Sequence, residues 1–167
     1  MSFESALRIK RSDADALYMA GQAYTQTGAL DKAELALRLA VAYVPIGWPE
    51  PYAALADLFT KAGRTAMAEW ASAMADVASG KLDKAEPRLK AIADSDAAVD
   101  VAIGLGLLYE SRGQGPEAAR WYSAALAKDP TNDAARLGMG RVGTALITSA
   151  VPTLPAPGAS LGVGGTN

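Results

Sequence analysis

The sequence predicts an all-α fold made of stacked pairs of short helices. Between turn signals, apolar residues recur three and four positions apart, which is the period of a helix, and no segment alternates like a strand. The hydrophobic fraction of 50% consists largely of alanine, with only 2 Phe and 3 Trp, and this favours closely packed helices over a β-sheet. A pattern of residues also recurs with a period of about 34, which is typical of helix-pair repeats.

Glycine and proline residues divide the first half of the chain into helices. Gly28 separates the first two helices, the second ends before Pro45, and Gly63 and Gly80 end the third and fourth. A proline disfavours helical geometry in the residue before it, so Pro45 is a firm stop. The expected helices span residues 14–27, 30–43, 50–62 and 65–79.

The second half follows the same rules with weaker helices. Pro87 lies four residues into the fifth expected helix and leaves only its first turn undisturbed. Gly113 and Pro130 mark the next two ends, and Asn132 or Asp133 can cap the last helix, which Gly138, Gly140 and Gly143 make intrinsically weak. These helices are expected over residues 83–94, 97–112, 115–128 and 132–148.

Two stretches of the chain match each other at eight positions. One unit starts at Ala14, the other at Val99, and a third, weaker copy starts at Pro49. In the same order, the three sets are Ala20, Gly21, Tyr24, Gly28, Ala33, Leu37, Ala40 and Pro45; Leu105, Gly106, Tyr109, Gly113, Ala118, Tyr122, Ala125 and Pro130; and Leu55, Ala56, Phe59, Gly63, Ala68, Ser72, Ala75 and Gly80.

The matching residues have a physical role in helix packing. Small residues remove bulk where two helices cross and allow the helix axes to approach closely. The aromatic residues fill the gaps between neighbouring helices, and the prolines end the second helix of a pair. The structural positions are Gly21, Ala33, Ala68, Gly106 and Ala118 for close approach, Tyr24, Phe59 and Tyr109 for wedges, and Pro45 and Pro130 for helix ends.

This pattern resembles the tetratricopeptide repeat (TPR), with three repeats over residues 14–132. The resemblance implies a helix-turn-helix solenoid wound as a right-handed superhelix. The middle departs from the pattern, because the second and third units start at Pro49 and Val99, farther apart than one period. Residues 83–94 are therefore expected to form an irregular extra helix, with residues 65–79 as partner of both 50–62 and 83–94. The last helix is expected to cap the open end.

The domain boundaries follow from the same reading. Residues 1–13 are expected to be the end of a capping helix or of a preceding repeat, which leaves open whether the chain belongs to a longer array. Residues 14–149 form the repeat domain, and residues 150–167 a Pro- and Gly-rich flexible tail. Within that tail, Ser160–Gly164 resembles the short peptides that direct cargo into encapsulin nanocompartments; an unstructured tail is the alternative.

Composition argues against several functions. Without Cys or His the chain lacks the ligands of zinc and haem-His sites and the base of Ser-His or Cys-His dyads, so we expect no metal, no cofactor and no enzyme activity. The net charge of -2 disfavours nucleic acid as a partner. No apolar stretch predicts a signal peptide or membrane insertion, so a cytoplasmic location is expected, with the periplasm left open for a fragment.

The resemblance also implies where a ligand would bind. In TPR proteins the first helices line a concave groove, and only Lys61 is basic among the positions carried over, so an acidic ligand is disfavoured. Apolar residues among them suit an amphipathic helix or an extended apolar peptide; alternatively, Ile103 and Leu107 pack against residues 83–94. The groove positions are Asp15, Tyr18, Gln22, Thr25, Gln26, Glu50, Ala53, Asp57, Thr60, Lys61, Asp100, Ile103, Leu107, Glu110 and Ser111.

The function expected from this reading is a non-catalytic protein-interaction module, an adaptor or assembly scaffold that binds a peptide or helix in the groove. Three alternatives stay open: a dedicated chaperone for secreted or assembling substrates, a docking subunit of an enzyme complex, and a cargo protein carried by its C-terminal tail. A larger complex or a homo-oligomer is compatible with each of them.

Overall fold

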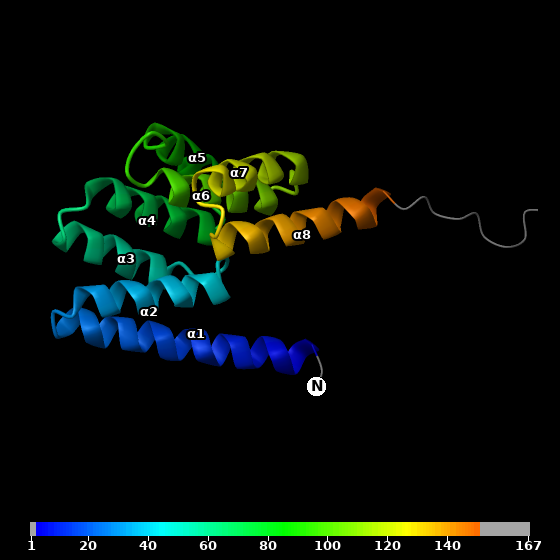
Figure 1. The fold of residues 1–167 in the computed structure, drawn as a ribbon. Helices are drawn as coiled ribbons and strands as arrows, with labels where there is room; N and C mark the ends of the chain where they lie inside the picture. The colour runs from blue at the N-terminus through cyan, green and yellow to red at the C-terminus, as the bar shows by residue number, and fades with distance from the viewer. Residues whose placement is uncertain (1–2, 151–167) are drawn as a thin grey trace, which may run out of the picture.

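The structure, a computed structural model, describes the backbone of residues 3–150 and the side chains of residues 13–144. Within that range the chain is all-helical, as the sequence predicts, and successive helices pack as antiparallel neighbours (Figure 1). Residues 151–167, which include nearly all of the expected tail and its Ser160–Gly164 motif, lie outside the described residues. The helices are α1 (Phe3–Gln26), α2 (Leu30–Tyr43), α3 (Glu50–Lys61), α4 (Thr65–Ala78), α5 (Leu82–Ala91), α6 (Ala98–Ser111), α7 (Gly115–Lys128) and α8 (Asp133–Ala150).

The first helix differs from the prediction. The sequence predicts a separate element over residues 1–13, but α1 runs without a break from Phe3 to Gln26. No glycine or proline occurs between Phe3 and Gly21, and Ser12 and Asp13, although favoured at helix caps, do not by themselves stop a helix. The described part of residues 1–13 is therefore the first part of α1 rather than the end of a preceding helix.

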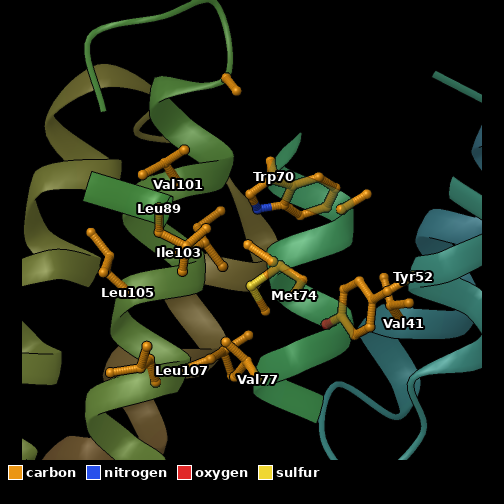
Figure 2. Packing of buried hydrophobic residues seen from close by; sticks show 14 of the residues in the cluster. Val41, Tyr52, Trp70, Met74, Val77, Leu89, Val101, Ile103, Leu105 and Leu107 are labelled. Atoms are coloured by element: carbon orange, nitrogen blue, oxygen red, sulfur yellow. The ribbon is translucent and has the colours of Figure 1, made fainter. Parts of the chain in front are cut away.

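The middle of the chain is organised around α4. This helix packs against α3, α5 and α6, and so has the two partners predicted for it. Trp70, Met74 and Val77 lie along α4 and are buried, and Figure 2 places Met74 between Ile103 of α6 and Tyr52 of α3. The extra helix α5 continues through Pro87, which therefore does not stop it after its first turn, and ends at Ala91, earlier than the sequence predicts.

Close approach between paired helices depends on two glycines. A Cβ atom added to Gly21 of α1 would lie 2.6 Å from Leu37 Cγ of α2. In the last pair, a Cβ on Gly106 of α6 would lie 2.5 Å from the ring of Tyr122 on α7. A Cβ atom added to Gly138 of α8 would clash with the same ring, so Tyr122 packs closely against both α6 and α8. These contacts leave no room for a side chain at Gly106.

A first inter-repeat contact joins α2 to the pair that follows it. Glu34 accepts hydrogen bonds from Arg38 on its own helix (2.9 Å) and from Arg64 after α3 (2.8 Å). Both guanidinium groups lie over the buried ring of Phe59, with centroid distances of 5.7 Å for Arg38 and 4.7 Å for Arg64. A carboxylate, two cations and an aromatic ring thus connect one helix pair to the next.

A second inter-repeat contact joins α5 to α6 with the same chemistry. Glu86 accepts hydrogen bonds from Lys90 Nζ (2.6 Å), Tyr109 Oη (2.6 Å) and Arg112 Nη1 (2.5 Å). Lys90 and Arg112 also lie 5.9 and 5.7 Å from the centroid of the Tyr109 ring. The hydrogen bonds from Lys90, then Tyr109 and Arg112, lower the pKa of Glu86 to about 2.

The third aromatic wedge of the sequence pattern has a different environment. Phe59 is buried and Tyr109 half-buried by a preceding helix, whereas Tyr24 is 38% exposed. The structure therefore does not show Tyr24 as a wedge between neighbouring helices, which is the role that the sequence predicts for it. Because α1 is the first described helix, no described second helix precedes it to cover the Tyr24 ring.

We predict opposite effects for two glycine-to-alanine changes. Gly106→Ala should lower the free energy of unfolding by about 1–3 kcal/mol, because the ring of Tyr122 cannot yield to a new methyl group. Gly140→Ala is the matched control: the space around Gly140 is open, and the gain in helix propensity should raise stability by about 0.5–1 kcal/mol. Urea denaturation of the two variants tests this, and shifts of the same sign would contradict it.

We predict that Glu86 stabilises the fold in a pH-dependent way. Since its pKa is lowered from an ordinary value of 4.5 to about 2, its contribution is complete above about pH 4.5 and is lost as the pH falls toward 2. Glu86→Gln should cost about 1 kcal/mol at pH 6, because the ion pairs are partly exposed, and almost nothing near pH 2.

Denaturation of wild type and variant across this pH range measures the difference. Glu117→Gln is the control, because among the described residues Glu117 makes only an exposed ion pair with Arg120. A cost of Glu86→Gln that does not change with pH would rule out an electrostatic role.

Candidate functional site

A polar hollow lies between α1 and α3. It has a volume of about 220 Å³ and is lined by Gln22, Thr25 and Gln26 of α1 and by Ala54, Asp57 and Lys61 of α3. Five of the groove residues proposed from the sequence therefore meet in one place: Gln22, Thr25, Gln26, Asp57 and Lys61. The hollow offers amide, carboxylate and ammonium groups, so it suits hydrogen bonding to polar groups of a ligand.

Two other proposed groove residues of α1 lie away from this hollow. Tyr18 is half-buried and packs edge-on against Trp48, with ring centroids 5.4 Å apart, and its hydroxyl accepts a hydrogen bond from Gln22 Nε2 (3.0 Å). Asp15 is exposed on the same helix. Tyr18 therefore supports the position of Gln22 and does not line the hollow.

The second hollow, which we call the apolar pocket, is larger and lies among the helices α2, α3, α4, α6 and α8 and two connecting segments. It has a volume of about 270 Å³. Ile103 and Leu107, both proposed groove residues, form part of its wall together with Trp70 and Met74 of α4 (Figure 2). Its lining residues are Arg38, Val41, Ala42, Pro45, Tyr52, Trp70, Met74, Asp100, Ile103, Gly104, Leu107, Asn132, Asp133, Ala134, Leu137 and Arg141.

An ion pair holds one end of the apolar pocket together. Arg38 of α2 donates to both carboxylate oxygens of Asp100 on α6, at 2.9 and 3.4 Å, and the indole N–H of Trp70 donates to the backbone oxygen of Asp100 (2.9 Å). Burial opposes the charge of Arg38, but Asp100 and then Glu34 outweigh it, so the pKa of Arg38 is raised. The pair fixes α2, α4 and α6 around the pocket.

The opposite wall of the apolar pocket comes from α8. Asp133, Leu137 and Arg141 are four residues apart and line the pocket from one face of this helix. In Figure 1, α8 turns back from α7 and begins close to the C-terminal end of α2. Leu137 is 58% exposed, so the pocket has an accessible apolar rim on this side.

Glu110 belongs to neither hollow. Its carboxylate accepts hydrogen bonds from Tyr122 Oη (2.6 Å) and from Arg141 Nε (2.7 Å), and so it joins α6, α7 and α8. Burial, then the hydrogen bond to Glu110, raises the pKa of Tyr122. The structure therefore places this proposed groove residue among the contacts that hold the C-terminal helix.

The two hollows share no lining residue, so the proposed groove positions do not form one continuous channel. The reason is the position of α4, which packs between α3 and α6. The first helices α1 and α3 therefore line one hollow, whereas α6 faces the other together with α2 and α8. A regular repeat would have placed α1, α3 and α6 in one row.

Sequence reasoning missed the α2 and α8 walls of the apolar pocket. It placed Val41 and Ala42 on a second helix, outside the groove, and assigned Leu137 to a cap. One signal for α2 was present, because Leu35, Leu39, Ala42 and Ile46 form an apolar row that is exposed rather than packed on α1. A helix that is apolar on two faces is expected to bury or offer both of them.

Two further findings concern the described residues. They contain no group of three or more His, Cys, Asp or Glu side chains close enough to hold a metal ion. Within the same range, every helix is too short or too polar to cross a bilayer.

Comparison with known proteins identifies the family. The family model described as tetratricopeptide repeat matches residues 2–51 and 70–133, which leaves out most of α3 and the start of α4. No curated protein matches the chain. Among solved structures, the TPR domain of Arabidopsis OM64 is similar at 17% identity and a TM-score of 0.40, over 81% of this chain and 98% of that one. Because the family model covers well over half of the sequence, the chain belongs to the tetratricopeptide repeat family.

Proposed function

We propose that this protein is a non-catalytic interaction module that holds an apolar side chain of a partner helix or peptide in the apolar pocket. The observation that carries the proposal is the pocket itself, where Ile103 and Leu107 meet Met74 and the exposed Leu137. Sites for drug-sized ligands commonly measure about 300–1,000 Å³, so a pocket of about 270 Å³ suits one or two side chains better.

Charged groups at the rim support a peptide ligand. Asp133 and Arg141 flank Leu137 on α8, and Arg38 and Asp100 lie across the pocket. An apolar anchor surrounded by polar groups is the usual arrangement of a protein-binding hot spot. A partner with an apolar residue next to polar ones, as on an amphipathic helix, fits this arrangement.

The polar hollow would then hold another part of the same partner. Gln22 and Gln26 offer amide groups that both donate and accept, which suits the backbone of an extended segment. Asp57 and Lys61 place one charge of each sign there, so the hollow does not select a strongly acidic ligand. In this proposal the apolar pocket supplies most of the affinity and the polar hollow adds orientation.

A chaperone role is the second candidate, and the surface of α2 favours it. Leu35, Leu39 and Tyr43 are exposed on this helix and Ile46 shortly after it, with Leu35 at 62%. Apolar side chains gathered on one exposed face indicate a surface that contacts other proteins. A chaperone would use this face to cover apolar segments of an unassembled substrate, whereas an adaptor would rely on the apolar pocket and the polar hollow without it.

The test compares two pocket variants with one outside it. Peptides selected from a random display library on the wild-type chain should bind at least tenfold more weakly to Ala42→Arg and to Leu137→Glu, because burying one large apolar side chain contributes about 1.5–3 kcal/mol. Leu35→Glu is the matched control and should change affinity less than about twofold in an adaptor.

Titration calorimetry on folded variants gives the affinities. Equal binding to the wild type and to both pocket variants would contradict the proposal. Loss of binding in Leu35→Glu alone would favour the chaperone alternative.

A further inference from the structure

We infer that the first helix pair has an open edge that binds a helix of a partner protein, and that this helix carries Glu four residues before Lys or Arg. The open edge consists of Leu17, Ala20 and Tyr24 on α1, with Lys32 at the start of α2. It shares no residue with the apolar pocket or the polar hollow. The inference therefore does not rest on the function proposed above.

The open edge is the equivalent of two surfaces that are covered elsewhere in the chain. The repeat pattern aligns Leu17, Ala20 and Tyr24 with residues at the same spacing in α3 and α6. In α3 all three equivalents are buried, and in α6 the first two are buried and Tyr109 is half-buried, whereas Tyr24 is 38% exposed. The equivalents are Tyr52, Leu55 and Phe59 in α3, and Ala102, Leu105 and Tyr109 in α6.

Both covered surfaces contact a helix of the same chemistry. Against α3, α2 places Glu34 and Arg38 four residues apart, and against α6, α5 places Glu86 and Lys90 at the same spacing. In each case the carboxylate binds a cation from the following pair, Arg64 or Arg112, and a cation from each helix lies over the aromatic ring. The same arrangement of a carboxylate, two cations and an aromatic ring therefore joins α2 to α3 and α5 to α6.

The open edge has two parts of this arrangement, an aromatic ring and a cation. Lys32 Nζ lies 5.8 Å from the centroid of the Tyr24 ring, as Lys90 and Arg112 lie over Tyr109. Neither Lys32 Nζ nor Tyr24 Oη has a carboxylate partner among the described residues. A glutamate of an incoming helix can accept hydrogen bonds from both groups, as Glu86 does from Tyr109, Lys90 and Arg112, and the cation one turn later can cover the ring.

A second copy of this chain fits the open edge poorly. End-to-end stacking would bring α7, the last second helix, against α1 of the next copy. Where α2 and α5 carry glutamate and a cation, α7 carries Ala119 and Ser123, and α8 already packs against α7. A second copy therefore does not supply the matching helix, and the occupant that we propose is a helix of a different protein.

The probe is a synthetic peptide with the sequence of Leu30–Tyr43, which contains Glu34 and Arg38, held helical by a side-chain crosslink on its outer face. The crosslink is needed because an isolated helix of this length is marginal in water. Its affinity for the full-length chain is measured by fluorescence anisotropy. Wild type should bind, Tyr24→Ala and Lys32→Glu should bind at least tenfold more weakly, and Tyr24→Phe should lie between them.

A charge exchange makes the test specific. A peptide with Glu34→Lys should bind poorly to wild type and recover at least tenfold on the Lys32→Glu chain. Lys128→Glu is the matched control, since Lys128 is an exposed lysine at the end of α7 that lines neither hollow, and it should leave peptide binding unchanged. Circular dichroism confirms that each variant is folded.

Three outcomes would overturn the inference. The first is a wild-type chain that does not bind the peptide, and the second is binding that Tyr24→Ala and Lys32→Glu leave unchanged. The third is self-association of the chain, measured by sedimentation, that Tyr24→Ala abolishes, because the occupant would then be a second copy. Failure of the pocket proposal would look different, since Leu137→Glu is expected to have no effect on binding of this peptide.

Discussion

The rest of the structure depends on the burial of α4 between its neighbours. A regular repeat pairs each helix with one partner, but α4 packs against α3, α5 and α6. Two of its faces are covered: Trp70, Met74 and Val77 form a buried apolar stripe, and on another face the buried carboxylate of Asp76 accepts a hydrogen bond from Arg88 of α5 (2.6 Å). Such a helix must be enclosed, because exposing the apolar stripe would lose its transfer free energy and the carboxylate needs its cation. The break in the repeat pattern between the second and third units follows from this requirement.

The same packing decides where a ligand can bind. With α4 between α3 and α6, the inner surfaces of the first and last pairs separate, and the space left beside α4 is lined by α2, α6 and α8. The ion pair between Arg38 and Asp100 spans that space and is partly shielded from water, which makes it stronger than a pair on the surface. The apolar pocket is therefore a product of the irregular middle rather than of the repeat pattern.

Charged residues fix the position of each helix pair relative to the next. The contacts of Glu34 and of Glu86 each join a helix to the next pair through hydrogen bonds that have directional geometry. Small apolar residues pack well in many registers, so alanine-rich helices gain a defined register from such contacts. The open edge at Tyr24 carries an aromatic ring and a cation of the same kind, which at the contacts of Glu34 and Glu86 are joined by a glutamate from the neighbouring helix.

Local rules were sufficient to predict the helices, the repeat spacing and the double role of α4, because periodicity, glycine and proline act over a few residues. They failed at Phe3–Gln26, where the absence of a breaker should have outweighed the repeat pattern, and at the end of α5, which continues through Pro87 and stops at Ala91. The sequence by itself determined which helices pair and where small residues allow them to approach closely, because both follow from local spacing. Only the tertiary structure decided that Ile103 and Leu107 face Leu137 instead of Gln22 and Asp57, because that choice depends on how α4 is enclosed by residues distant in sequence.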